Sequence, residues 1–397
     1  MSKTEMPSIR FGGFDNAWEQ RKLGEIITEY KETVDSECTL PILTSSKTEG
    51  VILQEEHFGR KQQHDITGYN ILPRNYCTYR NRSDGVDFTF NINKCCDKGI
   101  ISKFYPVFSG KNSDVFFLSL VLNNSDEVVR EIAYTCTGTG QKVLSFLDLQ
   151  KMKVRVPSYD EQKEIAAYFE NLDHLITLHQ RKYEKLQAFK VSMLEKMFPK
   201  DGADVPEVRF KGFDGSWEKM PASELFTSYV DKGHPELPVL SATQDAGMVV
   251  RNEIGKSVFH EAANEVGYKR VLPGQFVIHL RSFQGGFAHS AIEGITSPAY
   301  TVFGLKEPEN HDDYFWKYVF MSKQFIKRLE TVTYGIRDGR SISYDEFLTL
   351  DFLFPRKEEQ SLICQYLLKL DSLIAMRKQE LDKLQFIKKA LLEKMFV

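Results

Sequence analysis

The sequence predicts a mixed α/β (α+β) protein. Two similar globular domains are joined by two long helices that form an antiparallel coiled coil, with a pseudo-two-fold internal repeat. Three observations predict this fold. The chain of 397 residues is long enough for two to three domains. Two separate segments recur about 198 residues later. One of these segments carries the apolar heptad pattern that is typical of a long, paired helix.

The recurrence is strongest in the segment that closes each half of the chain. Residues 161–198 align without gaps with residues 359–396, and 17 of these 38 positions are identical. The start of each half also recurs, as the pattern Arg-Phe-x-Gly-Phe-Asp-x-x-Trp-Glu that ends at Glu19 and again at Glu218. The residues between these segments are only weakly similar. The frame of the repeat is therefore kept while its middle has diverged.

Each closing segment is predicted to be one long helix, because large residues recur at alternating spacings of four and three. At about 37 residues and 1.5 Å per residue, each helix is roughly 55 Å long. A lone heptad helix exposes its seam, so we expect the two copies to pair with each other, antiparallel across a pseudo-two-fold. The seam, which we also expect to take part in partner docking, includes Ile165, Phe169, Leu172, Ile176, His179, Ile363, Leu367, Leu370, Ile374 and Arg377.

The polar seam residues His179 and Arg377 occupy equivalent sites near the middle of their helices. An antiparallel pair would bring them close together as a buried polar layer that fixes the register. An outward bend of the seam at these positions is the alternative.

The predicted domain boundaries follow the repeat. Residues 1–156 and 201–354 are the globular domains, and residues 157–200 and 355–397 are the helical segments. Short β-rich runs broken by Gly, Asn and Asp turns indicate strands in both domains. Helices are predicted over Phe116–Leu122 and over the corresponding Tyr314–Thr331.

Composition and motifs exclude several classes of protein. The formal net charge of −3 excludes a protein that coats nucleic acid by charge alone. The six cysteines form no Cys-x-x-Cys pair, which indicates reduced, cytoplasmic usage and no zinc site. The N-terminus does not read as a signal peptide, and no apolar stretch is long enough for a membrane span.

Catalytic signatures are also missing. The sequence contains no phosphate-binding loop and no Asn/Asp-Pro-Pro-aromatic motif of amino-methylating DNA enzymes. Glu161 and Lys163 have the final spacing of a nuclease carboxylate–lysine pair, but the second copy has Ser361 in place of the lysine. We therefore predict no catalytic residue and no metal ligand in this chain.

The pattern of two variable domains, each followed by a matched helix, resembles the DNA-specificity subunit of type I restriction-modification systems. The segments that carry the resemblance are Val156-Pro-Ser-Tyr-Asp-Glu-Gln162, Phe354-Pro-Arg-Lys-Glu-Glu-Gln360 and Trp18-Glu-Gln-Arg-Lys-Leu-Gly24. The second copy of the tryptophan segment departs from the pattern after Trp217-Glu218. The resemblance covers essentially the whole chain.

The resemblance implies that each globular domain is a target recognition domain that reads one half of a split sequence in double-stranded DNA. The paired helices would set the spacer and dock two methyltransferase subunits, to which restriction (translocase) subunits can be added. The chain itself would need no cofactor. S-adenosylmethionine, ATP and Mg are expected on the partner subunits. The chain would supply the sequence specificity, and alone it should bind DNA weakly.

Three polar segments in each domain are candidates for DNA contact, because base and phosphate recognition needs Arg, Lys, Asn, Gln, Ser and Thr on loops. They fall at corresponding places in the repeat, although solvated loops are the alternative for any single residue. In the first domain the candidates are Ser45, Ser46, Lys47, Thr48, Arg80, Asn81, Arg82, Thr137, Gln141 and Lys142. In the second domain they are Thr243, Gln244, Arg281, Gln284, Arg337 and Arg340.

Two other functions are compatible with parts of the pattern. The chain could be a coiled-coil scaffold that joins proteins without DNA specificity. It could also be a self-sufficient DNA-modifying enzyme whose site the motifs do not reveal, but the missing signatures argue against this.

Overall fold

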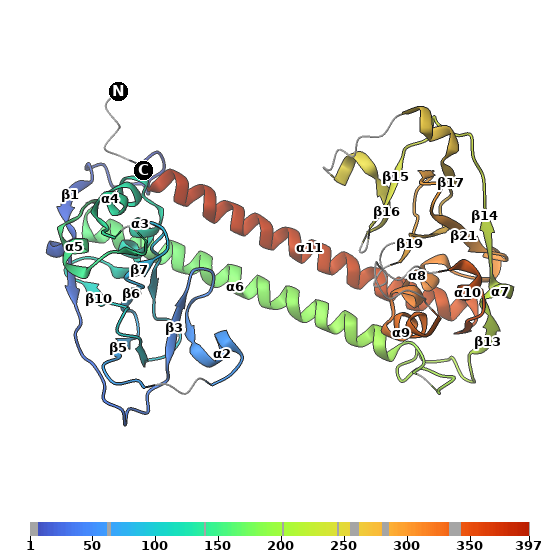
Figure 1. Cartoon of the computed structure of the whole chain (residues 1–397), viewed down its shortest axis with the longest axis horizontal. Coiled ribbons are helices and arrows are strands. Elements are labelled where there is room, and N and C mark those ends of the chain that lie inside the picture. The colour runs from blue at the N-terminus through green and yellow to red at the C-terminus, as the bar shows by residue number, and fades with distance from the viewer. Residues whose placement is uncertain are drawn as a thin grey trace. The chain divides into compact units, whose positions relative to one another are not determined.

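The computed structural model describes residues 7–61, 65–138, 140–200, 202–243, 246–254, 262–279, 286–332 and 343–396. The chain forms two compact units (Figure 1). Unit 1 comprises Met1–Gln180 and Gln379–Val397, and unit 2 comprises Arg181–Lys378. Each unit therefore contains one globular domain together with part of each long helix.

The domain of unit 1 is built on a four-stranded antiparallel sheet with the order β2-β10-β6-β8. Two-stranded ladders surround this sheet, namely β1-β12, β3-β4, β5-β9 and β7-β11. The strands are β1 (Glu19–Lys22), β2 (Ile27–Glu29), β3 (Leu43–Ser46), β4 (Gly50–Leu53), β5 (Asn70–Pro73), β6 (Cys77–Tyr79), β7 (Arg82–Ser83), β8 (Phe90–Ile92), β9 (Lys98–Ile101), β10 (Val107–Gly110), β11 (Lys142–Val143) and β12 (Lys153–Val156).

The domain of unit 2 repeats this topology. Its four-stranded sheet has the order β14-β21-β18-β19, and its ladders are β13-β22, β15-β16 and β17-β20. The strands are β13 (Glu218–Pro221), β14 (Phe226–Tyr229), β15 (Leu240–Thr243), β16 (Gly247–Val250), β17 (Lys269–Val271), β18 (Phe276–Ile278), β19 (Phe287–His289), β20 (Gly294–Thr296), β21 (Thr301–Leu305) and β22 (Asp351–Phe354). The predicted mixed α/β repeat is confirmed, even where the sequence of the middle has diverged.

Short helices complete both units. In unit 1 they are α1 (Leu23–Ile26), α2 (Gln54–Phe58), α3 (Val115–Asn124), α4 (Asp126–Thr135) and α5 (Phe146–Lys151). In unit 2 they are α7 (Ala222–Leu225), α8 (Asp313–Met321), α9 (Lys323–Val332) and α10 (Tyr344–Leu348), with 3-10 turns η1 (Arg251–Ile254), η2 (Ala262–Gly267) and η4 (Pro308–Asn310). The helix predicted over Phe116–Leu122 corresponds to α3.

The single helix predicted over Tyr314–Thr331 is wrong, because α8 and α9 are separate helices on either side of Ser322. The backbone of Ser322 is extended, with ψ 145°. Its hydroxyl accepts a hydrogen bond from the amide of Phe325 at 3.2 Å, which caps the start of α9. Ser125 caps α4 of unit 1 in the same way. A serine side chain can satisfy the free amides of a helix start, and this makes the break favourable.

Asp114 caps α3 and provides a test of this part of the fold. Its carboxylate accepts from the amide of Phe117 at 2.8 Å. We expect Asp114→Ala to lower the free energy of unfolding by about 1 kcal/mol, since one helix-terminal amide loses its partner. Asp114→Asn keeps an acceptor and should remain close to wild type. Urea denaturation of the three proteins measures the difference, and equal losses in both variants would contradict the capping role.

The two long helices are α6 (Tyr159–Lys196) and α11 (Lys357–Met395). They run antiparallel within each unit, as predicted. In unit 1, Asp173 of α6 forms an ion pair with Lys388 of α11 at 2.5 Å, and His179 Nδ1 lies 3.4 Å from Glu380 Oε2. Residue numbers therefore rise along α6 while those of their partners fall along α11, as in an antiparallel pair. In unit 2, Lys190 pairs with Asp371. The predicted approach of His179 to Arg377 involves both units and stays a prediction.

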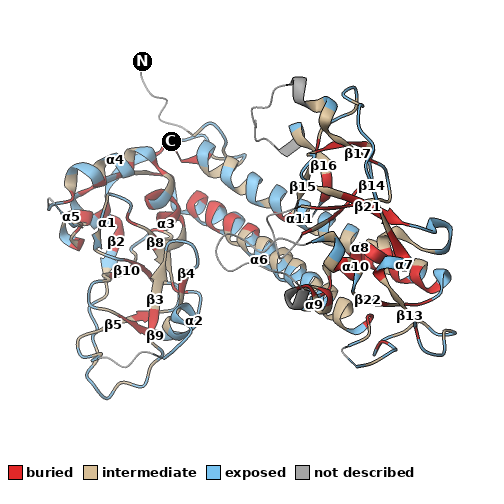
Figure 2. Cartoon of the chain, turned by 45° about the vertical axis from the view of Figure 1, so that its right-hand side comes forward, coloured by how far each residue is buried: buried red, intermediate tan, exposed pale blue. Residues whose placement is uncertain are grey.

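The seam residues nearest each domain also belong to the domain core. Figure 2 shows buried residues at the N-terminal end of α6, where Ile165, Phe169 and Leu172 pack against the sheet and α3. Ile363, Leu367 and Leu370 of α11 do the same in unit 2. Ile176 and Ile374 are half-buried.

The last residue of each repeat packs in the domain of the other repeat. Phe396 lies among Trp18, Phe117 and Phe169 in unit 1, with ring centroids 5.9 to 6.2 Å apart. Phe198 lies in the same way against Trp217 and Phe315 in unit 2. The recurring Leu-Glu-Lys-Met-Phe therefore contributes an aromatic side chain to each core, which explains why both copies retain it.

Candidate nucleic-acid interface

The Glu-Gln pair of each signature segment is a structural junction. Both oxygens of Glu161 accept hydrogen bonds from Arg10 at 2.6 Å, and the Glu161 side chain is fully buried. These hydrogen bonds raise the pKa of Arg10. In unit 2, Arg209 binds Glu359 in the same bidentate manner at 2.7 and 2.8 Å. Each pair ties the start of a repeat to the start of its long helix.

The neighbouring glutamine completes the junction. Gln162 Oε1 accepts from the hydroxyl of Ser113 and the amide of Asp114, while its Nε2 donates to the carbonyl of Pro157 at 2.9 Å. Gln360 makes the equivalent bonds to Asp312 and Pro355 in unit 2. The long helix, its preceding strand and the α3 or α8 helix are therefore held in one arrangement, which gives the loops of each domain a fixed base.

The three polar segments of unit 1 come together in space. Strand β7 pairs with β11, and Thr137 bridges to Val143, so the second and third segments are neighbours. The first segment forms the tip of the β3-β4 hairpin, where Ser46 faces Gly50. Asn91 of β8 donates to the Ser45 hydroxyl at 2.8 Å and fixes this hairpin to the central sheet.

A pocket of about 370 Å³ lies where the first and second of these segments meet. Its lining includes three cations that the sequence singled out, Lys47, Arg80 and Arg82, together with Ser45. Arg80 and Arg82 are exposed, and the Arg82 guanidinium lies 4.5 Å from the centre of the Phe104 ring. An exposed concave surface with several fixed cations can bind phosphates and the edges of bases.

The remaining candidates of unit 1 differ in their surroundings. Thr48, Thr137 and Gln141 are exposed, and Lys142 is half-buried in β11. Asn81 is turned inward, because its Oδ1 is buried. The Asn81 backbone joins two segments by donating to Phe104 and accepting from Leu144. Asn81 therefore holds the neighbouring loops in place.

Sequence reasoning missed the two carboxylates of this pocket, Asp84 and Asp87. Asp87 forms an ion pair with Lys47, and its second oxygen accepts from the hydroxyl of Ser83 at 2.8 Å. These hydrogen bonds, the one from Lys47 foremost, lower the pKa of Asp87. The candidates for DNA contact were chosen among cationic, amide and hydroxyl side chains, so a carboxylate was not included. Only the contact between residues 40 positions apart shows that Asp87 belongs to the site.

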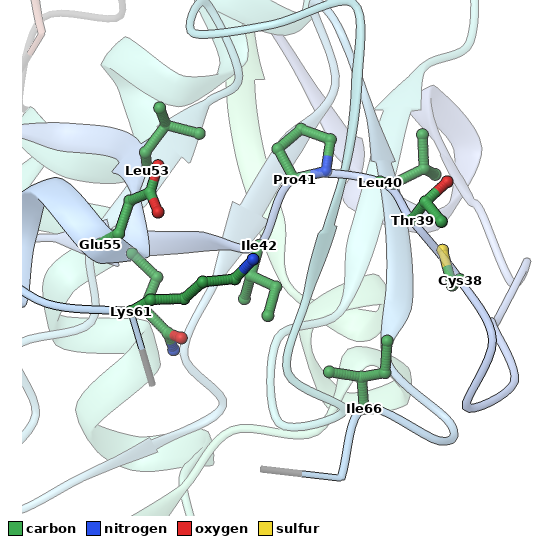
Figure 3. A pocket seen from close by; sticks show the side chains of 10 residues that line it. Cys38, Thr39, Leu40, Pro41, Ile42, Leu53, Glu55, Lys61 and Ile66 are labelled. Carbon is green, nitrogen blue, oxygen red and sulfur yellow. The ribbon is translucent and has the colours of Figure 1, made fainter. Parts of the chain in front are cut away.

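A second pocket of unit 1 has a different character. It has a volume of about 410 Å³ and lies at the base of the β3-β4 hairpin, where Ile42 and Leu53 flank the strands (Figure 3). Figure 3 shows the side chains of Leu40, Pro41 and Ile66 around it, with Lys61 at its edge. None of the predicted DNA-contacting residues lines this pocket.

The candidates of unit 2 are described only in part. Thr243 ends β15, and its hydroxyl donates to the carbonyl of Gly247 at 2.8 Å while accepting from the amide of Ala246. Thr243 therefore closes the turn of the β15-β16 hairpin, the counterpart of β3-β4. The other five predicted residues lie outside the described residues, namely Gln244, Arg281, Gln284, Arg337 and Arg340.

The described part of the chain has neither a cluster of metal ligands nor a helix suited to a membrane. Its His, Cys, Asp and Glu side chains form no group of three or more that could hold a metal ion. No helix among the same residues is both long and apolar enough to cross a membrane.

Comparison with known proteins shows a family resemblance. The family model for the type I restriction modification DNA specificity domain matches residues 16–188. Residues 16–188 therefore resemble the DNA specificity domain of type I restriction-modification systems. The matched domain is a DNA specificity domain, and specificity subunits of this kind are non-catalytic.

Relatives of this chain span most of its length. The type I restriction enzyme MjaVIII specificity subunit of Methanocaldococcus jannaschii is 23% identical over 313 residues, which cover 74% of this chain and 73% of the relative. The type I restriction-modification S subunit from M. genitalium has the same fold, with a TM-score of 0.55, 13% identity and 99% of both chains covered.

A chain from a structure on complex assembly and conformational transition of the type I R-M system also has this fold, with a TM-score of 0.50 and 15% identity. It covers 97% of this chain and 98% of its own length. The second repeat lies beyond residues 16–188, but it has the strand order of the first.

Proposed function

We propose that this chain is a specificity subunit that reads a bipartite DNA target, one half with the domain of unit 1 and the other half with the domain of unit 2. The observation that carries the proposal is that two of the predicted polar segments line one pocket in unit 1, while the third pairs with the second segment through β7 and β11. Because the middle parts of the repeats have diverged, the two half-sites should differ in sequence. The formal charge of −3 indicates that partner subunits supply much of the affinity for the phosphate backbone.

The long helices would set the length of the spacer between the half-sites. With 38 residues in α6 and 39 in α11, each helix is roughly 57 Å long at 1.5 Å per residue. Neighbouring half-sites on the same face of a duplex are about 34–36 Å apart. Helices of this length are therefore sufficient to span one turn of DNA.

The same helices would dock two methyltransferase subunits. Six of the seam residues predicted for docking are buried in the cores of their units, so a partner would also use positions beside the seam. These six are Ile165, Phe169, Leu172, Ile363, Leu367 and Leu370. Beside the seam on each long helix, large apolar residues recur every seven positions. Only the third position of each series of four is not apolar. We call these positions the apolar stripe, in which four residues are exposed, Tyr168, Leu175, Phe189 and Ile387, and two are half-buried, Tyr366 and Leu373. A third apolar position in each heptad exceeds what a two-helix seam needs and indicates a further packing partner.

A methylation experiment tests the proposed function. The chain is co-expressed with the methyltransferase subunit of a type I system, and N6-methyladenine is mapped across the genome. We expect methylation at one bipartite sequence only when this chain is present. Loss of the chain should abolish it, and a methylome that is the same with and without the chain would contradict DNA recognition and favour a scaffold.

The apolar stripe on the long helices gives a separate prediction. Replacing Leu175 and Leu373 by aspartate should weaken methyltransferase binding by about 100-fold or more, because each unit would then present a charge to the apolar partner surface. Leu147→Asp is the control, since Leu147 is 68% exposed on the short helix α5 and lies outside the long helices α6 and α11. Size-exclusion chromatography with light scattering gives the stoichiometry. A full complex with the double variant would exclude this docking surface.

A further inference from the structure

Two carboxylates line the pocket that we propose to face DNA, Asp84 and Asp87. The phosphate backbone repels a carboxylate at such an interface unless the carboxylate accepts a hydrogen bond from the nucleic acid. In the major groove, the donors on base edges are the exocyclic amino groups of cytosine and adenine. A carboxylate fixed in this pocket therefore points to recognition of an amino group.

Asp87 is fixed in the way that such recognition requires. Its Oδ1 accepts from Ser83 at 2.8 Å, and its Oδ2 is paired with Lys47. Both contacts favour the ionised form, which can only accept hydrogen bonds. A carboxylate offers about four acceptor sites, so these two donors leave room for another. The Asp87 side chain is 64% exposed and accessible to a ligand.

Lys47 supplies the complementary group. It lies at the tip of the β3-β4 hairpin, and its side chain is 63% exposed. Its ammonium has three donors, one of which is used by Asp87, so it can also bind a phosphate or the O6 and N7 of a guanine. Arg80 and Arg82 border the same pocket. An acceptor is thus held next to several donors, which matches the mixed pattern on the edge of a base pair.

We propose that Asp87 determines sequence specificity in unit 1 by accepting a hydrogen bond from the amino group of an adenine or a cytosine. Lys47, oriented by Asp87, binds the adjacent phosphate or guanine. This inference rests on the proposed DNA-reading function, and it assigns one position of the half-site to an acidic side chain.

The first test maps methylation for the full chain co-expressed with its methyltransferase partner. Asp87→Asn replaces an acceptor by a group that also donates, so we expect the requirement for adenine or cytosine to relax at one position of one half-site. Methylation of sites with another base there should rise about 10-fold, while the other half-site is unchanged. Asp84→Asn removes the same charge from the same pocket and should leave the consensus intact.

The second test removes the amino group from the DNA. In a duplex, the base at the relaxed position is replaced by purine (for adenine) or 2-pyrimidinone (for cytosine), which lack this group. The wild-type complex should bind this duplex about 10-fold more weakly than the normal target, and the Asp87→Asn complex should bind both equally. Equal wild-type binding would overturn the proposal.

The outcomes separate this inference from the proposed function. If Asp87→Asn lowers methylation evenly at an unchanged consensus, Asp87 only orients Lys47 and the inference is wrong, while DNA recognition stands. If the wild-type chain directs no sequence-specific methylation with a competent partner, the proposed function fails and this inference fails with it.

Discussion

Replacing Glu161 with alanine is expected to lower the free energy of unfolding of unit 1 by about 3–5 kcal/mol. The variant leaves the guanidinium of Arg10, whose side chain is 10% exposed, without its bidentate partner. An unpaired charge in a buried position loses its hydration without compensation, and this cost exceeds the value of the ion pair itself. Urea denaturation measures the loss. Hydrogen exchange over residues 7–19 assigns it to the junction of unit 1.

Two further variants show whether the charge is the cause. Glu164→Ala removes an exposed carboxylate from the same helix, and it should change the free energy of unfolding by less than about 0.5 kcal/mol. Combining Arg10→Met with Glu161→Leu removes both charges and should recover most of the stability. If Glu161→Ala unfolded at the same urea concentration as the wild type, the pair would contribute nothing to the fold.

Reversing the charge of Arg80 and Arg82 together is expected to weaken binding of the assembled complex to its DNA target by about 100-fold or more. Each arginine that contacts a base or phosphate contributes roughly 1–3 kcal/mol, and 1.4 kcal/mol corresponds to a factor of ten. The slope of log affinity against log salt should also fall by about two, because two phosphate or base contacts are lost. Fluorescence anisotropy over a salt series measures both quantities.

A charge-matched variant is needed for this experiment, since any loss of four charge units weakens DNA binding nonspecifically. Lys22→Glu with Lys111→Glu reverses two exposed cations of the same unit that do not line the pocket. This control should bind within a few-fold of the wild type. Similar losses in both double variants would show that general electrostatics, and not the pocket, governs affinity.

Much of the fold could be predicted because its signals are local. The heptad spacing of α6 and α11 depends only on which residues recur every three or four positions. The ends of both helices lie within two residues of the ends of the matched segments 161–198 and 359–396. The antiparallel pairing followed from the likeness of the two copies. The break at Ser322 was missed, since the apolar pattern runs through it and only the capping hydrogen bond ends the helix.

The candidate site could be predicted only by segment. Polar loops at matching places in the repeat identified the neighbourhood of Lys47, Arg80 and Arg82, which the structure brings to one pocket. The roles of single side chains depend on partners far away in the sequence. The side-chain oxygen of Asn81 is buried, and its own backbone pairs with Phe104 and Leu144. Asp87 belongs to the pocket through Lys47, and no local pattern reveals that contact.

By itself the sequence determined that this protein is one unit used twice, with a diverged domain and a retained helix in each copy. Periodicity and repetition are properties of the chain alone. Only the tertiary structure decided which contacts the retained residues make. Glu161 meets Arg10 across 151 positions, and Phe396 enters the core beside Trp18. Such contacts arise only when folding brings distant segments together, because burial and ion pairing depend on spatial neighbours and not on sequence neighbours.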